Sequence, residues 1–161
     1  VSVSEIVNGK VFFAQNQSAS TTAQLETIDK ALAKVGSECG TSTSASGNGV
    51  LEPKRNMNCL ALFDDGTGMK WFRAKILMVI REKNEELLRI RYVDFGNEET
   101  VKSERLRIPA DDSIFSNPPI AQECELAFVK VPSLDKEYGN EAAICLNDLV
   151  FGKKVTATMH G

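Results

Sequence analysis

The chain has 161 residues, and its 42% hydrophobic and 25% charged residues are typical of an ordinary globular domain. A net charge of −3 argues against non-specific nucleic-acid binding, which requires a basic surface. The single histidine, His160, argues against histidine-based catalytic triads and most histidine metal sites, so the composition favours a binding module over an enzyme.

The cysteines are not spaced as zinc ligands or as a redox pair. They are Cys39, Cys59, Cys124 and Cys145. Three of them lie in apolar segments, which predicts buried free thiols in a reducing compartment. No apolar run approaches the roughly 20 residues of a membrane span, and no secretory signal is visible. We therefore predict a cytoplasmic protein, with the nucleus as a further location, and no membrane association.

The first 49 residues predict a hairpin, a helix and a linker. Alternating apolar residues indicate strands on both sides of Asn8-Gly9, which is a type I′ turn signal. Apolar residues at steps of three and four between positions 25 and 35 predict one amphipathic helix that ends at Gly36. Residues 37–49 are rich in Ser, Thr and Gly, which predicts a flexible linker.

Residues 50–110 predict a small, strongly bent β-barrel, because short apolar runs alternate with turn signals about every ten residues. In the longest run, alternation assigns one face to apolar residues. These are Phe72, Ala74, Ile76, Met78 and Ile80. The basic residues on the opposite face are expected to form a stripe on the outside of the barrel. The stripe consists of Arg73, Lys75, Arg89 and Arg91.

Residues 111–161 predict a strand over 123–131, a helix that begins near Asn140 and a last strand over 155–159. The parts of the chain on either side of the barrel are each too small to fold alone. We expect them to form one α+β lobe with the barrel inserted in its middle. Because Val1 opens directly into a strand pattern, the sequence resembles a piece of a larger protein.

Four aromatic residues stand where predicted strands end near turns. They are Phe63, Phe72, Tyr92 and Phe95. Alternation puts Tyr92 and Phe95 on opposite faces, so a bend at Gly96 must rotate Phe95 if both are to point into one site. Aromatic faces that form a box attract a cation, and a methylated cation loses less hydration on entering it. The Asn97 amide oxygen is able to accept a hydrogen bond from a guanidinium. The alternative is that these rings belong to the core.

The Tudor domain pattern of F-x-D-G, W-Y-R-A and Y-I-D-Y-G-N resembles three segments of this chain. They are Phe63-Asp64-Asp65-Gly66, Trp71-Phe72-Arg73-Ala74 and Tyr92-Val93-Asp94-Phe95-Gly96-Asn97. The flanking sequence is similar to extended Tudor domains of the Tudor staphylococcal nuclease type. The resemblance implies a mainly β fold with α elements, in which an SH3-like Tudor barrel over 50–110 is inserted into a staphylococcal-nuclease-like, OB-type lobe. That lobe is formed by 1–49 and 111–161, and the resemblance implies that it stops before its final strand and helix.

The same resemblance implies a reader of symmetrically dimethylated arginine in Arg-Gly- or Arg-Ala-rich tails of Sm-type or Piwi-type proteins. The resemblance implies that such a domain is part of a multidomain RNA-processing protein, active in RNA silencing or splicing, and that RNA is a possible partner through the parent protein. The cage walls carry over to Phe63, Phe72, Tyr92 and Phe95, and Asn97 orients the guanidinium. Phe72 and Phe95 stand where the family has tyrosine, so two hydroxyls are lost. No cofactor or metal is implied.

Two other functions compete with this reading. An OB-type RNA-binding module would use the basic stripe. A nuclease unit would need arginines on the substrate phosphate, and residues 1–15 and 123–161 contain none, so we predict no enzyme activity. Several acidic residues are expected either to form a negative rim that attracts basic peptides or to be a solvated surface. They are Asp64, Asp65, Glu98 and Glu99. Asp94 is expected to bond backbone N–H groups of the turn rather than a ligand.

Overall fold

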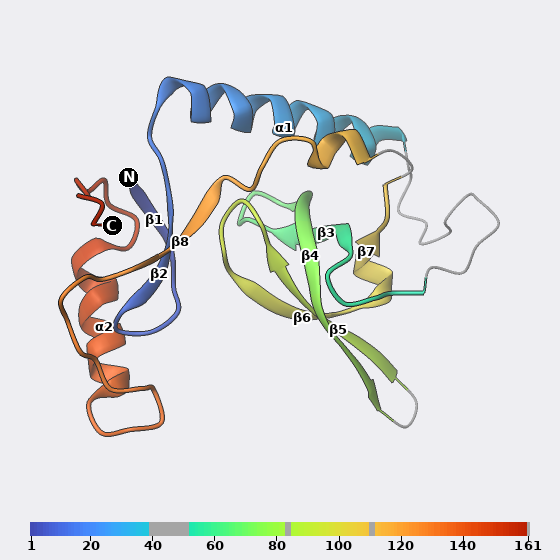
Figure 1. Ribbon diagram of the computed structural model, residues 1–161. Helices are drawn as coiled ribbons and strands as arrows, with labels where there is room; N and C mark the ends of the chain where they lie inside the picture. Colours follow the sequence, from blue (N-terminus) through green and yellow to red (C-terminus); the bar gives the residue numbers. More distant parts are fainter. Residues whose placement is uncertain (39–51, 83–84, 110–111, 161) are drawn as a thin grey trace. The chain divides into compact units, whose positions relative to one another are not determined.

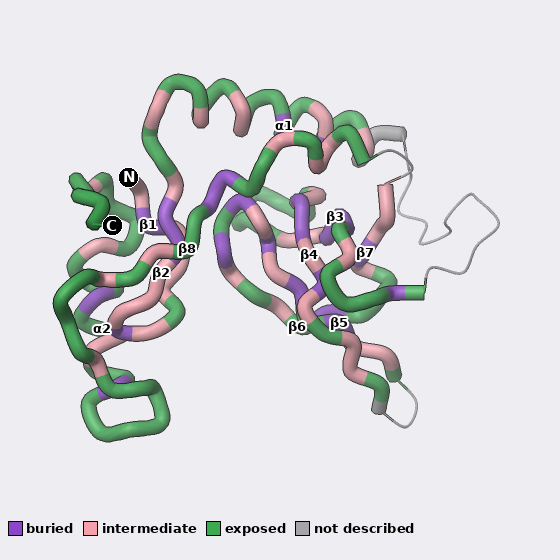
Figure 2. The backbone as a smooth tube through the Cα atoms, in the orientation of Figure 1, coloured by how far each residue is buried: buried purple, intermediate pink, exposed green. Residues whose placement is uncertain are grey.

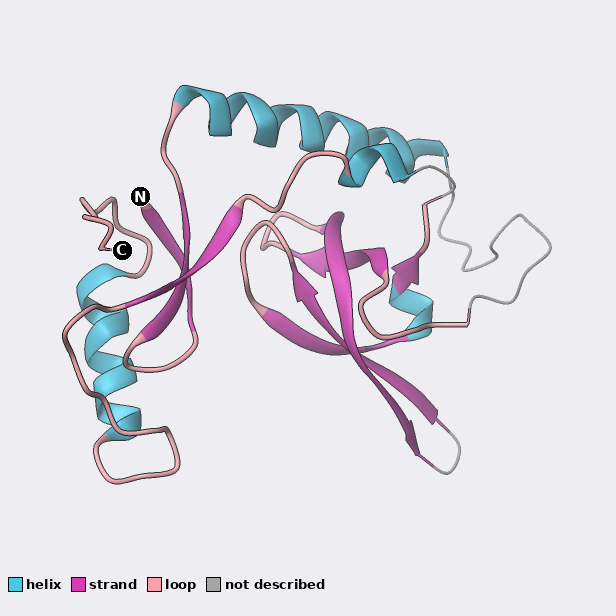
Figure 3. Cartoon of the chain, in the orientation of Figure 1, coloured by secondary structure: helices cyan, strands magenta, loops and turns pink. Residues whose placement is uncertain are grey.

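The computed structural model describes residues 1–38, 52–82, 85–109 and 112–160 (Figure 1). The chain divides into two compact units, which are taken in turn. Unit 1 consists of residues 1–22, 94–97 and 119–161, and unit 2 consists of residues 23–93 and 98–118. The prediction of a mainly β fold with helices is confirmed (Figure 3).

Unit 2 is built on an antiparallel sheet with the strand order β6-β5-β4-β3-β7. The strands are β3 (Asn58–Asp64), β4 (Met69–Glu82), β5 (Glu85–Tyr92), β6 (Glu98–Lys102) and β7 (Leu106–Arg107). The two edge strands, β6 and β7, are joined only by the 3₁₀ turn η1 (Ser103–Arg105). That connection spans at most roughly 14 Å, whereas the edges of a flat five-stranded sheet lie about 19 Å apart. The sheet therefore has to curl, which gives it the shape of a barrel.

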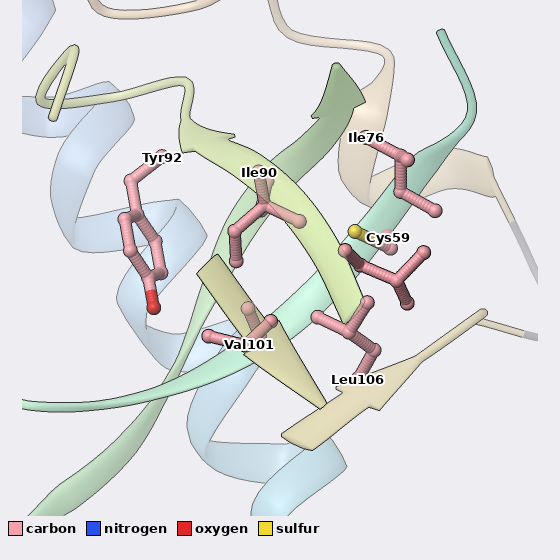
Figure 4. Packing of buried hydrophobic residues seen from close by; sticks show 9 residues of the cluster. Cys59, Ile76, Ile90, Tyr92, Val101 and Leu106 are labelled. Carbon is pink, nitrogen blue, oxygen red and sulfur yellow. The ribbon is translucent and has the colours of Figure 1, made fainter. Parts of the chain in front are cut away.

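The inward-facing positions of this sheet supply the core of unit 2 (Figures 2 and 4). The buried set is Cys59, Ala61, Ala74, Ile76, Leu88, Ile90, Tyr92, Val101 and Leu106. Burial raises the pKa of the Cys59 thiol to about 12, so this cysteine stays protonated as a small apolar side chain. The described cysteines are free thiols, but Cys124 is half-buried and Cys145 is exposed, so the prediction of three buried thiols is wrong for them. Cys39 lies outside the described residues.

A β-bulge interrupts β4 and exchanges the faces of its second half. Ile76 lies opposite Ile90, but Met78 lies opposite Arg89 and Val79 opposite Leu88. One extra residue in a strand moves every following side chain to the other face. Val79 therefore packs against the core, whereas Met78 is 52% exposed. The prediction that Met78 shares the apolar face of Ile76 is wrong, because alternation alone does not reveal a bulge.

Helix α1 (Ala19–Glu38) contributes its first residues to unit 1 and the rest to unit 2. The Ser18 hydroxyl accepts a hydrogen bond from the Thr21 N–H at 3.2 Å, so Ser18 caps the helix. Ile28 and Leu32, from the predicted apolar stripe, are buried. The helix continues beyond the predicted stop at Gly36 and includes the first residues of the predicted linker; the rest of that linker lies outside the described residues.

Unit 1 contains an antiparallel sheet with the order β1-β2-β8 and the helix α2. The bounds are β1 (Ser2–Ile6), β2 (Val11–Gln15), β8 (Ala121–Glu125) and α2 (Gly139–Val150). The turn between β1 and β2 is closed by the Asn8 side chain, whose Oδ1 accepts the N–H groups of Lys10 and Val11, both at 2.8 Å. Neither Asn8 nor Gly9 has a positive φ, so the predicted type I′ turn is wrong.

The C-terminal part of unit 1 has less strand than predicted. β8 ends at Glu125, and Phe128 has a positive φ of 62°, which no strand tolerates. Residues 155–160 form no strand; Val155 only exchanges two backbone hydrogen bonds with Val1. Residues 155–159 alternate apolar and polar residues and residues 126–131 are mostly apolar, but neither segment has a neighbouring strand that continues the ladder within the described residues.

Candidate functional site

Three of the aromatic residues that the sequence singled out meet on one side of the unit 2 sheet. They come from the ends of β3, β4 and β5, and they are Phe63, Phe72 and Tyr92. The strand register explains why they meet. Phe72 lies opposite Ala61, two residues before Phe63, so the two rings share a face and lie diagonally across the strand pair. Tyr92 lies opposite Ala74, two residues after Phe72, and reaches it in the same way.

The three rings pack edge to face. The ring centroids of Phe63 and Tyr92 are 5.1 Å apart at an interplanar angle of 61°. Phe63 and Phe72 are 6.0 Å apart at 84°, and Phe72 and Tyr92 are 6.2 Å apart at 87°. A planar cation held between two ring faces needs a separation of roughly 7 Å. These rings are too close for that, so they form a corner rather than two parallel walls.

Burial differs among the three rings. Phe63 and Phe72 are half-buried, whereas Tyr92 is only 2% exposed and is part of the barrel core. Tyr92 thus lies in the core and makes edge-to-face ring contacts with both phenylalanines. The alternative interpretation of the aromatics as core residues holds for Tyr92, and Phe63 and Phe72 are partly buried side chains packed against that core.

The Tyr92 hydroxyl has a defined partner. It donates a hydrogen bond to Glu99 Oε2 at 2.8 Å, and the Arg105 guanidinium holds the same carboxylate through two bonds of 2.5 and 3.0 Å. Burial acts to raise the pKa of Glu99, but the bonds from Arg105 and Tyr92 outweigh it and lower this pKa below the usual range. Burial and the neighbouring Glu99 carboxylate raise the pKa of Tyr92, so its hydroxyl remains a donor.

Sequence reasoning did not find this role for Glu99 and did not single out Arg105. Glu99 lies opposite Ile90 in the pairing of β5 with β6, which places it diagonally next to Tyr92. Only the register of β5 against β6 reveals that Glu99 lies beside Tyr92. That register depends on the turn between the two strands, and the sequence pattern did not define the geometry of this turn.

Phe95 and Asn97, the other two predicted site residues, belong to unit 1. The Phe95 side chain is 37% exposed, and its backbone oxygen accepts a hydrogen bond from Ser4 Oγ at 2.6 Å. Asn97 is half-buried. The segment 94–97 is anchored within unit 1 by Gln15 Nε2, which donates to the Asp94 backbone oxygen at 2.6 Å.

Asp94 has the structural role that the sequence predicted. It is 4% exposed, and its Oδ1 accepts the backbone N–H of Ile120 at 3.1 Å. A buried carboxylate that receives a backbone N–H is engaged in holding the chain. This bond agrees with the expectation that Asp94 accepts a backbone N–H, but the N–H comes from Ile120 and not from the turn.

Arg73 does not belong to the predicted basic stripe on the outside of the barrel, whereas Lys75 lies opposite Arg91 on the neighbouring strand. Arg73 is 1% exposed, and its guanidinium donates to three backbone oxygens at 2.7 to 3.1 Å. Those oxygens belong to Ile114, Asn117 and Pro118. Arg89 and Arg91 both form ion pairs with Glu98. The stripe was expected because alternation points Arg73 away from the apolar face, but the chain after β7 covers that position.

The acidic residues near the rings do not form a free negative rim. Asp65 pairs with Lys70 at 2.7 Å, and the hydrogen bonds of Lys70 and Thr67 lower the pKa of Asp65. Glu98 and Glu99 are paired with arginines. Asp64 accepts the N–H of Gly66 within its own turn. Asp64 and Asp65 are exposed, so the solvated-surface alternative describes them, with a local ion pair and turn bonds.

Within the described ranges, no three His, Cys, Asp or Glu side chains gather as metal ligands. No described helix is both long and apolar enough to cross a membrane. Aromatic rings such as those of the corner attract cations through their faces.

Comparisons with known proteins agree on one family. The sequence profile described as Tudor domain matches residues 1–128. Among curated proteins, Ribonuclease TUDOR 1 of Arabidopsis thaliana is 33% identical over 155 residues, covering 94% of this chain and 14% of the relative. Staphylococcal nuclease domain-containing protein 1 of Drosophila melanogaster is 31% identical over 155 residues, covering 96% of this chain and 15% of the relative. The chain thus spans only a small part of these relatives.

Solved structures with the same fold include the extended Tudor domain of Drosophila melanogaster Tudor-SN. Its TM-score is 0.70 at 28% identity, with 98% of this chain and 70% of that chain covered. The human TDRD1 extended Tudor domain, solved in complex with a symmetrically dimethylated peptide, gives a TM-score of 0.70 at 27% identity over 92% of this chain and 67% of that chain. Extended Tudor domain TD3 of mouse TDRD1 shares the fold with a TM-score of 0.73 at 21% identity, over 94% of this chain and 70% of that chain.

Proposed function

Because the chain belongs to the Tudor domain family, we propose that it binds symmetrically dimethylated arginine in Arg-Gly- or Arg-Ala-rich protein tails. Tudor domains are peptide-binding modules, and this chain is one of them rather than an enzyme. The proposal concerns the ligand and the residues that bind it.

The observation that carries the proposal is the edge-to-face corner of Phe63, Phe72 and Tyr92. A guanidinium that lies on ring faces gains about 0.5–2 kcal/mol per good contact. Methyl groups remove N–H donors that would otherwise need water, and they add apolar surface that the phenylalanine faces cover. From the family resemblance alone, the proposal also assigns Phe95 as a cage aromatic and the Asn97 amide oxygen as the acceptor of a guanidinium N–H.

The known structures support the same class of ligand. The human TDRD1 domain was solved with a symmetrically dimethylated peptide, and mouse TD3 with a MILI peptide that contains dimethylarginine. For this chain we propose tails of Piwi-type or Sm-type proteins as partners. We further propose that it works in the cytoplasm, or also in the nucleus, within a multidomain RNA-processing protein of the silencing or splicing machinery, and that any RNA is bound by the rest of that protein.

The proposed architecture is a Tudor barrel over 50–110 inserted into a staphylococcal-nuclease-like, OB-type lobe made of residues 1–49 and 111–161. Two observations support it. Unit 1 draws on both ends of the chain, with β8 beside β2 and Val155 bonded to Val1. The extended Tudor domain of Tudor-SN shares the fold over 98% of this chain.

One titration tests the ligand. The chain is titrated with an Arg-Gly peptide in unmodified, symmetric dimethyl and asymmetric dimethyl forms, and with a single-stranded RNA. We expect the symmetric form to bind with a micromolar dissociation constant, since a short peptide loses much conformational entropy on binding. The other two peptide forms should bind several-fold more weakly. Equal affinity for all three peptide forms would contradict the proposal, and RNA binding that is tighter than peptide binding would favour the RNA-binding alternative.

Substitution of the rings tests the site. We expect Phe72→Ala and Phe95→Ala to abolish the preference for the methylated peptide while the domain remains folded by circular dichroism. The matched control is Phe128→Ala, because Phe128 is 90% exposed and lies outside the proposed cage. If the control reduces binding as much as the site variants do, the aromatic residues bind peptide without a defined cage.

A further inference from the structure

Arg105 connects two of the three aromatic rings through the backbone and a carboxylate. Its Nη2 donates to the Leu62 backbone oxygen at 2.5 Å, and its Nε donates to the same oxygen at 3.2 Å. Leu62 immediately precedes Phe63 in β3. The other side of the guanidinium holds Glu99, which receives the Tyr92 hydroxyl. We call Glu99 and Arg105 the carboxylate–guanidinium clip.

The clip joins elements that the sheet alone does not fix at this point. β3 and β6 are not neighbours in the strand order β6-β5-β4-β3-β7. Arg105 in η1 reaches the Leu62 end of β3, and Glu99 lies on β6. Because the Phe63 and Tyr92 rings are 5.1 Å apart, a small movement of either strand end would change the corner between them.

The clip also balances charge beside a site for a cation. Arg105 carries a positive charge that would repel an arginine side chain of a ligand. Its hydrogen bonds to Glu99 are charge-assisted and two-pronged, which fixes the geometry and offsets the charge. The Glu99 bond raises the pKa of Arg105, and the pKa of Glu99 is lowered, so both groups are ionised at neutral pH.

We propose that Glu99 and Arg105 are positioning residues for the aromatic site: they hold the ring edges of Phe63 and Tyr92 in place and thereby set the discrimination between methylated and unmodified arginine. This inference rests on the function proposed above. It assigns to the clip a role in selectivity, whereas a merely stabilising ion pair would change the melting temperature and leave the selectivity unchanged.

The first test compares Glu99→Gln with Glu98→Gln. Glu98 is the neighbouring residue on β6, and it also pairs with arginines, but its partners are Arg89 and Arg91 rather than Tyr92. The readout is the ratio of dissociation constants for the unmodified and the symmetric dimethyl Arg-Gly peptides. We expect Glu99→Gln to lower that ratio at least threefold and Glu98→Gln to leave it unchanged. A wild-type ratio in folded Glu99→Gln would overturn the inference.

Tyr92→Phe provides a second variant that removes one hydroxyl and retains the ring. We expect it to lower the ratio as Glu99→Gln does, and the double variant to lower it no further, because the bond to Glu99 at 2.8 Å is much shorter than the hydroxyl's second contact, with the Leu62 backbone oxygen at 3.4 Å. Additive losses would overturn the inference. If Glu99→Gln does not fold, Tyr92→Phe decides the question alone.

Ring motion provides a readout that needs no ligand. The chain has two tyrosines, and Tyr138 is 64% exposed, so it serves as an internal reference for Tyr92 in NMR spectra. We expect the Tyr92 ring to flip faster in Glu99→Gln, whereas the flipping rate of Tyr138 should not change. A wild-type protein that shows no methyl preference, combined with faster flipping in the variant, would refute the proposed function and leave the positioning of the ring intact. Unchanged flipping would refute the positioning itself.

Discussion

At the residue scale, Arg73 is a charged side chain that occupies a buried position in the fold. Its guanidinium is buried and provides donors to the backbone oxygens of Ile114, Asn117 and Pro118. These oxygens lie in the stretch that follows β7 and contains the 3₁₀ turn η2 (Asp112–Phe115), and Arg73 ties it to β4. The side chain is committed to structure and is not available to nucleic acid.

We expect Arg73→Met to destabilise the protein by about 2–4 kcal/mol, since it removes three hydrogen bonds of a buried guanidinium to partly buried backbone oxygens while keeping much of the side-chain volume. The measurement is urea unfolding followed by fluorescence of Trp71. Arg89→Met is the matched control: Arg89 is exposed, and loss of such a surface pair costs about 0–1 kcal/mol. Equal losses in the two variants would show that Arg73 is not a structural anchor.

The lowered pKa of Glu99 predicts how the free energy of unfolding depends on pH. A carboxyl group with a lower pKa in the folded state than in the unfolded chain stabilises the fold when it is ionised. Its contribution is complete above the unfolded value of about 4.3 and is lost as the pH falls through the lower folded-state pKa. We therefore expect the unfolding free energies of wild type and Glu99→Gln to differ at pH 7 and to converge below about pH 4. A difference that grows in acid would contradict this assignment.

At the scale of elements, the turn that follows β5 depends on Gly96. Its φ is +94°, which disfavours any residue with a side chain, and an added Cβ would overlap the Phe13 side chain. The sequence indicated a bend at this glycine that would rotate Phe95. It did not reveal that the bend packs against Phe13 of β2, because Phe13 is far from Gly96 in the sequence.

Two glycine substitutions separate conformational strain from steric overlap. Gly66 also has a positive φ, of +87°, but no atom lies within 4 Å of an added Cβ. We expect Gly66→Ala to cost about 1–2 kcal/mol, from backbone strain alone, and Gly96→Ala to cost clearly more because Phe13 must move. Thermal unfolding measures both. Similar losses of stability in the two variants would mean that the Phe13 ring moves aside without destabilising the fold.

Strand patterns were informative where the ladder is regular and failed where it is not. Alternation identified β3 and β5 and the first half of β4. It failed after Ile76, where the bulge exchanges faces, and over residues 155–159, where the pattern of a strand exists without a partner that would pair with it in the described part of the chain. A bulge and a missing neighbour are both properties of strand pairing, which a single segment does not encode.

At the scale of the whole molecule, the chain interleaves its two units. Unit 1 takes residues from both ends of the sequence and also residues 94–97 from the middle, between two strands of unit 2. Phe72 and Phe95 stand at the two positions where the Tudor pattern has tyrosine. Phe72 belongs to unit 2 and Phe95 to unit 1. Around the barrel, Asp65, Glu98 and Glu99 form local ion pairs with Lys70, Arg91 and Arg105.

The sequence by itself determined the class of fold, the family and the identity of the aromatic residues, because these depend on residue types and on short-range periodicity. Only the tertiary structure decided that Phe63, Phe72 and Tyr92 meet edge to face, that Arg73 is buried and that Glu99 with Arg105 holds Tyr92. These facts depend on strand register and on contacts between distant segments. A shift of one residue in register reverses every side chain of a strand, and no local pattern reports it.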